Sequence, residues 1–158
     1  MDSDRTRIGN SNDQFMMHTV VVIPAYNEER TVAEVVRNVR EHIPDVIVVD
    51  DGSSDATGER ARSVGAIVVR HCVNRGLGAA LGTGIAAALS FSSSFRASSE
   101  ESRSIDPADI IVTMDADGQH DPMEIAALVA PIEHGEADVV IGTRWGMRPP
   151  PLTPPPGE

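Results

Sequence analysis

Apolar and polar positions alternate along the chain in blocks. Five short apolar runs, rich in Val and Ile, predict buried β-strands. They cover residues 18–23, 45–50, 66–70, 109–114 and 137–141. Four longer segments with helical spacing lie between these runs, at residues 28–42, 54–64, 78–89 and 122–132. Strands that alternate with helices predict βαβ units, and therefore an α/β fold with a mostly parallel central sheet between layers of helices.

Residues near the expected helix ends support these assignments. In the first helix, Val side chains recur on one face, at positions 32, 35, 36 and 39. Gly65 is placed to end the second helix. Asp121 precedes Pro122, a pair typical of a helix start. Gly82 and Gly84 interrupt the Ala-rich third helix, which we therefore expect to pack close to the sheet.

The flanking segments differ in composition from this block. Residues 1–17 are polar and mixed in charge, and predict a flexible leader without a signal peptide. Residues 90–104 are Ser-rich and predict a solvated loop inside a domain that spans 18–146. Residues 147–158 form a Pro-rich tail that cannot continue a helix or a central strand. No run of 18 apolar residues occurs, so we expect no transmembrane segment.

Charge and residue usage exclude several classes of protein. The net charge is −11, and all 13 basic residues are Arg, so the chain has no Lys. This balance argues against nucleic-acid binding, and acid excess without Lys resembles proteins of high-salt cytoplasms. The absence of Lys also excludes a P-loop and Schiff-base catalysis. A single Cys, Cys72, excludes an internal disulfide and favours a reducing, cytoplasmic compartment.

Two of the predicted strands end in paired acids. Asp115 and Asp117 follow the fourth run, and Asp50 and Asp51 end the second. The carboxyl ends of parallel strands meet at one edge of a sheet, where open α/β folds bind ligands. Carboxylates in this position favour a hard divalent cation that carries a diphosphate. The two acidic loops therefore predict one metal and phosphate site at this edge.

Other loops carry polar residues that could serve the same site. The turn at residues 24–28, with the sequence PAYNE, can offer N–H groups and a carboxylate to a nucleoside; alternatively, Asn27 caps the next helix. Residues 74–76 open a helix, and a Gly-rich helix start favours anions. Gln119 adds a neutral metal ligand beside the acids. Arg144, after the last run, could bind phosphate or form a surface ion pair.

Five motifs occur in the order typical of family 2 glycosyltransferases. They are VVIPAYNE at 21–28, VVDDGSSD at 48–55, NRGLGAA at 74–80, DADGQHDP at 115–122 and IGTR at 141–144. Residues 19–145 resemble the branch of dolichyl-phosphate mannose and glucose synthases. The resemblance implies a GT-A fold, a Rossmann-like three-layer sandwich, and inverting transfer of a sugar from a UDP- or GDP-sugar. It also implies a polyprenyl or dolichyl phosphate acceptor, as in protein glycosylation, and peripheral association at the cytoplasmic membrane face.

The resemblance assigns roles residue by residue. The implied donor-binding residues are Pro24, Ala25, Tyr26, Glu28, Asp51, Arg75, Gly76, Asp115 and Ala116. The implied ligands for Mg²⁺ or Mn²⁺ are Asp115, Asp117 and Gln119. Asp117 and Arg144 are the implied catalytic residues, and Arg144 approaches phosphate. A divalent ion at this place would neutralise charge on the leaving nucleoside diphosphate.

Other interpretations stay open. After Trp145 the chain becomes Pro-rich where family members continue with acceptor-side residues, so the alternative is a truncated nucleotide-sugar-binding module without turnover of its own. The Asp-x-Asp loop also resembles haloacid-dehalogenase-like phosphatases, but those expect Thr or Val at position 119 and a downstream Lys, whereas this chain has Gln119 and no Lys. His71 and Cys72 are neighbours whose side chains point to opposite faces of a strand, so we expect both to be structural.

Overall fold

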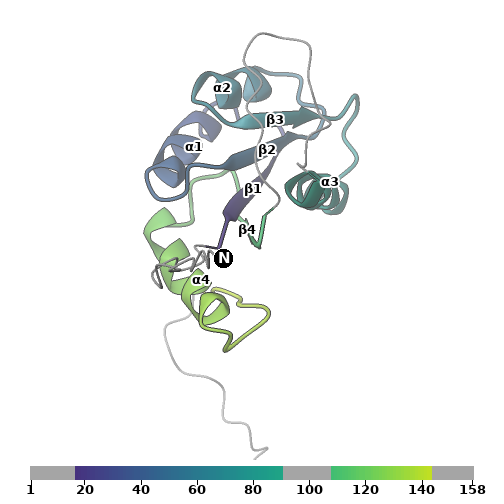
Figure 1. Ribbon diagram of the computed structural model, residues 1–158. Coiled ribbons are helices and arrows are strands. Elements are labelled where there is room, and N and C mark those ends of the chain that lie inside the picture. The colour runs from purple at the N-terminus through teal and green to yellow at the C-terminus, as the bar shows by residue number, and fades with distance from the viewer. Residues whose placement is uncertain (1–16, 91–107, 144–158) are drawn as a thin grey trace, which may run out of the picture.

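The computed structural model describes residues 17–90 and 108–143. Its centre is a parallel, four-stranded sheet with the order β3-β2-β1-β4 (Figure 1). The strands are β1 (Thr19–Ala25), β2 (Val46–Asp50), β3 (Ile67–Arg70) and β4 (Ile110–Thr113). All four form where the apolar runs predict them. The expected α/β fold with a parallel sheet is confirmed.

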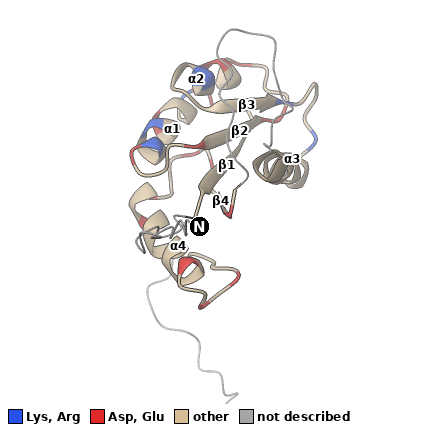
Figure 2. Cartoon of the chain, in the orientation of Figure 1, with Lys and Arg blue, Asp and Glu red and all other residues tan. Residues whose placement is uncertain are grey.

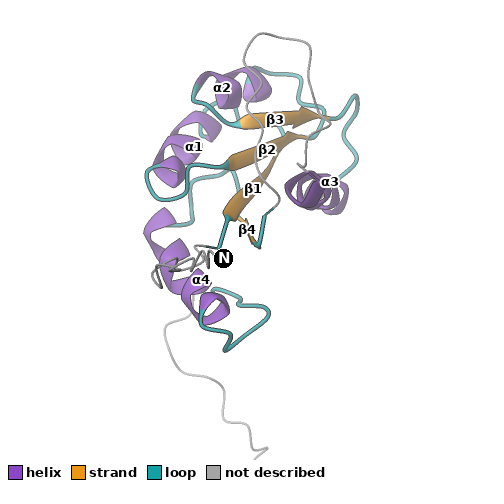
Figure 3. Ribbon diagram, viewed as in Figure 1, coloured by secondary structure: helices purple, strands orange, loops and turns teal. Residues whose placement is uncertain are grey.

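Helices cover both faces of this sheet and make three layers (Figure 3). They are α1 (Val32–Arg40), α2 (Thr57–Ser63), α3 (Leu77–Ser90), the 3₁₀ turn η1 (Pro122–Glu124) and α4 (Ile125–Glu133). The helices α1 and α2 lie on one face, and α3 is the described helix on the other. Figure 2 shows α3 without a charged residue, in contrast to α1 and α2.

Side chains of the two central strands alternate between two cores. Val21 and Ile23 point toward α1 and α2, and they join a cluster that also contains Ile125 and Val129 of α4. Val20 and Val22 point the other way, toward the Ala-rich face of α3. Because both faces are covered, β1 and β2 are apolar along almost their whole length, which is typical of buried parallel strands.

The residues that end and begin helices act largely as the sequence predicts. Gly65 has φ +87° and follows the last turn of α2, where an L-residue with a side chain would be strained. Asp121 accepts a hydrogen bond from the N–H of Met123, and Pro122 occupies the first turn. Gly84 of α3 lies so close to the sheet that a Cβ would meet Val22. The expected close approach of α3 to the sheet is confirmed.

Two expectations are wrong. The first helix begins at Val32 rather than at residue 28, and Asn27 does not cap it, because its side chain bonds the loop after β2. Residues 137–141 form no strand. The N–H groups of Glu136 and Ala137 turn back to the Pro131 carbonyl at the end of α4. The apolar side chains that follow are therefore exposed, 75% for Val139 and 81% for Ile141, and do not face a sheet.

Several expected features lie outside the described residues. These are the leader apart from Met17, the Ser-rich loop apart from Ser90, the Pro-rich tail and Arg144. Ser90 itself ends α3. Among the described helices, none has the length and apolar character needed to cross a bilayer.

Candidate functional site

The loops that follow the strands gather at the carboxyl edge of the sheet. β1 is flanked by β2 on one side and by β4 on the other, so the direction of the winding reverses between β1 and β4. Open α/β folds bind ligands in the crevice outside such a reversal point. The loops after β1, β2 and β4 carry the motifs that the sequence singles out. The fold therefore brings these motifs to one edge, as expected.

The loops after β1 and β2 are fixed to each other by reciprocal hydrogen bonds. The N–H of Asn27 donates to Ser53 Oγ at 3.0 Å, and the N–H of Ser54 donates to Asn27 Oδ1 at 2.9 Å. The N–H of Glu28 donates to Thr57 Oγ1 at 2.8 Å. Asn27 holds φ +55°, a left-handed conformation that Asn tolerates better than most residues. The two loops therefore form one rigid wall.

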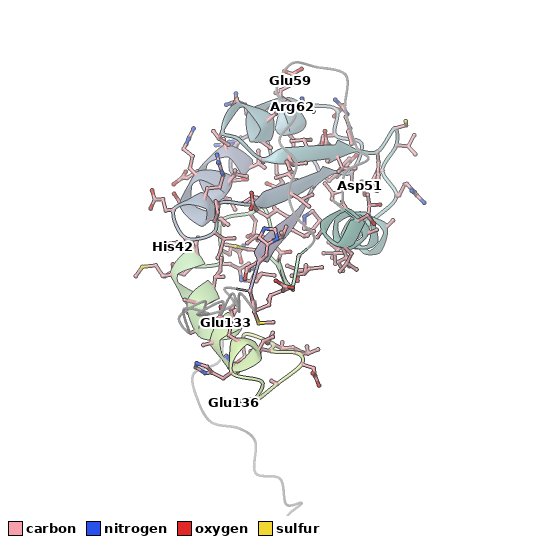
Figure 4. The ribbon with its side chains drawn as sticks, viewed as in Figure 1. His42, Asp51, Glu59, Arg62, Glu133 and Glu136 are labelled. Atoms are coloured by element: carbon pink, nitrogen blue, oxygen red, sulfur yellow. The ribbon has the colours of Figure 1, made fainter. Side chains whose placement is uncertain are left out.

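Asp51 is the anchor of a second wall. Its carboxylate accepts hydrogen bonds from the N–H of Arg75 at 2.9 Å and from the N–H of Gly76 at 2.7 Å. His71 Nδ1 lies 2.6 Å from the same carboxylate. Burial alone would raise the pKa of Asp51, but the bonds from Arg75, His71 and Gly76 hold that pKa below its usual value. Figure 4 shows Asp51 at the ends of the strands, beside α3.

Asp50, in contrast, is a structural acid. It is fully buried, and its Oδ1 accepts a hydrogen bond from the N–H of Ser53 at 2.9 Å. Its Oδ2 makes no hydrogen bond within the described residues and lies 3.4 Å from Arg70 Nε, an ion-pair contact. A Cβ on Gly58 would lie 2.7 Å from this oxygen, so α2 leaves no room there. Asp50 therefore organises the turn, and a ligand would not reach it.

The Asp-x-Asp loop presents both of its acids to solvent. Asp115 and Asp117 are exposed, whereas Ala116 between them is 4% exposed and packs into the core. Asp117 Oδ1 accepts a hydrogen bond from the N–H of Gln119 at 2.9 Å, which closes the turn. Asp115 Oδ2 lies 3.2 Å from His120 Nε2. Ala116 is thus buried between two residues whose carboxylates are exposed.

These carboxylates suit a hard divalent cation. Carboxylate oxygens are the ligands that Mg²⁺ and Mn²⁺ prefer. Within residues 17–90 and 108–143, however, no three His, Cys, Asp or Glu side chains converge into a complete metal site. Two carboxylates alone would leave most coordination positions to other oxygens, such as those of a diphosphate. The donor set therefore fits a cation that arrives with, or is completed by, a phosphorylated ligand.

A pocket of about 220 Å³ lies between this loop and the first two turns of α1. Its lining residues are Thr31, Glu34, Val35, Asn38, Met114, Asp117, Gly118, His120 and Pro122. Asp117 therefore borders an open space. Most of its polar lining is acidic or neutral, which agrees with a cation next to the Asp-x-Asp loop.

The other candidate residues divide into two groups. Pro24 and Ala25 are buried at the end of β1, where the Ala25 carbonyl accepts the N–H of Asp51, whereas Tyr26 is 47% exposed. Glu28 Oε2 accepts a hydrogen bond from Thr31 Oγ1 at 2.9 Å. Arg75 is exposed beside the second wall. The structure thus places the nucleoside candidates on the loops after β1, β2 and β3, and the metal candidates on the loop after β4.

His71 is the polar residue whose place the sequence reasoning missed. It is 8% exposed, and both of its ring nitrogens have partners, Asp51 Oδ1 and Thr83 Oγ1. The signal that could have found it is strand register. Asp50 pairs with Arg70 in the parallel ladder, so the residues that follow, Asp51 and His71, must lie side by side. Its neighbour Cys72 is exposed and does not join the site.

Comparison with known proteins gives consistent relatives. An uncharacterized protein of Methanocaldococcus jannaschii is 43% identical over 125 residues, which is 78% of this chain and 45% of the relative. UDP-N-acetylglucosamine–dolichyl-phosphate N-acetylglucosaminyltransferase of Methanococcus voltae is 34% identical over 142 residues, 78% of this chain and 51% of the relative. The chain thus spans about half the length of these relatives.

A similar solved structure is glucosyl-3-phosphoglycerate synthase of Mycobacterium tuberculosis in complex with Mn²⁺, UDP-glucose and phosphoglyceric acid. It has a TM-score of 0.57 and 30% identity, and the match covers 76% of this chain and 40% of that one. The sequence profile described as Glycosyl transferase family 2 matches residues 20–90 and 96–153. The chain therefore belongs to glycosyl transferase family 2, and its resemblance to the dolichyl-phosphate sugar synthase branch is confirmed.

Proposed function

We propose that this protein transfers a sugar from a nucleoside diphosphate sugar to a polyprenyl phosphate, in a metal-assisted inverting displacement. One observation carries the proposal: Asp115 and Asp117 stand exposed on either side of a buried alanine at the reversal point of the sheet. Membership of glycosyl transferase family 2, and the similarity to a solved structure that holds Mn²⁺ and UDP-glucose, support the same chemistry.

The proposed donor site uses the two walls at the ends of β1 and β2. Tyr26 offers an exposed aromatic ring to the nucleoside, and Asp51 holds the N–H groups of Arg75 and Gly76 in place. The backbone of Pro24 and Ala25 closes the floor of this site. A direct bond from Glu28 or Asp51 to the nucleoside remains a prediction, as do the roles of Arg75 and Gly76.

The proposed diphosphate site uses the loop after β4. Asp115, Asp117 and Gln119 would hold Mg²⁺ or Mn²⁺; the side chain of Ala116 is buried in the core, so of this residue only the backbone could contact the donor. When bound, such an ion neutralises charge on the diphosphate leaving group as a Lewis acid. The residues themselves orient the donor, because the turn closed by Gln119 fixes Asp117 before any ligand binds. We assign Arg144, beyond the described residues, to a phosphate group.

The proposed acceptor is a lipid phosphate at the cytoplasmic membrane face. The Methanococcus voltae relative is a dolichyl-phosphate N-acetylglucosaminyltransferase. A Mycolicibacterium smegmatis relative, 35% identical over 135 residues, is a polyprenol monophosphomannose synthase. A phosphate acceptor is already anionic, so the transfer needs positioning of the nucleophile rather than a general base to deprotonate it. The described loop after β4 accordingly presents exposed carboxylates for a cation.

Calorimetry tests the donor and metal assignments. Binding of UDP and GDP is measured with and without Mn²⁺, for the wild type, Asp117→Asn and the control Asp138→Asn. The asparagine at 117 can still accept the N–H of Gln119, so the turn is kept and only the charge is lost. Asp138 is an exposed acid on the loop after α4. We expect Mn²⁺ to raise wild-type and Asp138→Asn affinity by at least about tenfold, worth ~1.4 kcal/mol, and not that of Asp117→Asn.

Equal affinity with and without Mn²⁺ in the wild type would refute the metal assignment. Transfer is then measured with radiolabelled UDP- and GDP-sugars and a polyprenyl phosphate. Metal-dependent label in the lipid fraction supports the full proposal. Metal-dependent donor binding without lipid labelling would leave a nucleotide-sugar-binding module and refute the transfer step for this chain.

A further inference from the structure

A buried histidine connects the candidate donor site to α3. His71 follows β3, and its Nδ1 lies 2.6 Å from Asp51 Oδ1 while its Nε2 lies 2.9 Å from Thr83 Oγ1 of α3. Asp51 is ionised at neutral pH, since its pKa is below the usual value, so the carboxylate can only accept. Nδ1 must therefore carry the proton. The Thr83 hydroxyl can donate to Nε2 or accept from it, so both ring nitrogens have a partner.

The Asp51 carboxylate holds an exposed loop through backbone groups alone. It accepts the N–H of Arg75 and the N–H of Gly76, and Asp51 is itself only 4% exposed. Gly76 has φ +87°, and a Cβ there would meet nothing within 4 Å, so this loop faces open space. The loop thus forms a wall of the site, and the Asp51 carboxylate holds it from outside the loop; within the loop, the N–H of Gly76 also donates to Asn74 Oδ1 at 3.0 Å.

The geometry points to His71 as a positioning residue for the donor, an inference that rests on the proposed function. The imidazole Nδ1–H fixes the rotation of the Asp51 carboxylate, and that carboxylate accepts the N–H groups of Arg75 and Gly76 and so holds the loop that forms one wall of the proposed donor site. Thr83 holds the ring from the opposite side. His71 itself touches no donor atom in this arrangement. Its removal should therefore change donor affinity through the loop.

The chain allows a matched set of variants. Asn at position 71 carries its amide nitrogen where His71 carries Nδ1, so His71→Asn can still donate to Asp51. Gln carries its amide nitrogen where His71 carries Nε2, so His71→Gln can bond Thr83 but not Asp51. His71→Leu bonds neither. Each variant loses packing or a bond, so all three should lower the free energy of unfolding, measured with urea.

Two readouts separate positioning from mere stability. Hydrogen exchange reports on the N–H groups of Arg75 and Gly76 without any ligand, and calorimetry with UDP or GDP and Mn²⁺ reports on the donor. We expect His71→Gln and His71→Leu to exchange Gly76 faster and to bind the nucleotide more weakly, each by about tenfold, as for one lost charge-assisted bond. We expect His71→Asn to stay within about threefold of the wild type in both, a small fraction of one such bond.

The outcomes decide the inference. Indistinguishable exchange and affinity in His71→Asn and His71→Gln would overturn it, and so would affinities that follow only the loss of global stability. If the wild type binds neither UDP nor GDP, the proposed donor function fails and the donor role of His71 fails with it. If the wild type binds nucleotide and the two variants differ only in exchange, the donor role of His71 is refuted while the proposed function stands.

Discussion

Replacement of Gly84 by alanine should show how tightly α3 is seated on the sheet. Gly84 is buried in the middle of α3 and faces β1 and β2. A Cβ at this position would lie 2.3 Å from Val22 Cγ1 and 3.1 Å from Val49 Cγ2. Both valines are fully buried and β-branched, so neither can rotate away at small cost. The helix or the sheet must shift to admit a single methyl group.

The magnitude follows from two opposed terms. Extra atoms in a well-packed core cost about 1–3 kcal/mol. Alanine in place of glycine in a helix gains about 1 kcal/mol of propensity. Gly82, two residues earlier in the same helix, is exposed and would meet nothing within 4 Å. Gly82→Ala therefore carries the propensity gain without the clash, and the difference between the two variants isolates the packing cost at ~1–3 kcal/mol.

Urea unfolding followed by circular dichroism measures this difference. We expect Gly82→Ala to be more stable than the wild type by up to about 1 kcal/mol, and Gly84→Ala to be less stable than Gly82→Ala by at least ~1 kcal/mol. Unchanged m-values would show that both variants unfold from the same kind of native state. Equal stability of the two alanine variants would refute the close contact between α3 and the sheet.

Three other substitutions test the loops at the site. Gly52→Ala should lower the free energy of unfolding by more than about 1 kcal/mol in urea, because φ is +74° and a Cβ would lie 2.5 Å from the Val73 carbonyl carbon. Asp121→Ala should cost about 1 kcal/mol of helix capping in thermal unfolding; an unchanged Tm would contradict the cap. Burial would raise the pKa of Asp55, but bonds from Thr57 outweigh it and lower that pKa, so the unfolded state binds more protons as pH falls below about 4. Urea midpoints should therefore fall more from pH 5 to pH 3 in the wild type than in Asp55→Asn, and equal acid dependence would contradict the lowered pKa.

The centre of the sheet could be predicted because its two central strands, β1 and β2, are buried on both faces. Runs such as 45–50 have no polar alternation, and a run of that kind has only one stable place, inside a parallel sheet covered by helices. Helix ends were predictable where a single residue ends or caps the helix, as Gly65 and Asp121 do. These two helix ends depend only on residues close in the sequence, and both are confirmed.

Local patterns failed where the outcome depends on a distant partner. Residues 137–141 have the composition of a strand, but the chain turns back over α4 and gives that segment no neighbouring strand within the described residues. Asn27 has the side chain of a helix cap, yet it bonds Ser54, which lies 27 positions away in the chain. Neither the strand pairing of residues 137–141 nor the contact of Asn27 can be predicted from the local sequence alone.

Strand register explains a contact at the candidate site that the structure shows and the sequence analysis did not predict. Ala25 pairs with Asp50, and Asp50 pairs with Arg70, so the three loops that follow these residues start at the same level along the sheet. This register places Asp51 beside His71, a contact that the residue types alone do not predict.

The loop after β4 leaves the sheet at a different level along the strands from the loops after β1, β2 and β3. In the ladder, Thr113 of β4 pairs with Val22, three residues before Ala25, so β4 ends short of β2 by about 10 Å at ~3.3 Å per residue. The Asp-x-Asp loop therefore leaves the sheet set back from the wall that Asp51 anchors. The loop then continues through Met114 and Asp115 to Asp117, so its carboxylates lie beyond the point where it leaves the sheet. The proposed donor, with a nucleoside at one end and a diphosphate at the other, has two groups of different chemistry for these two regions.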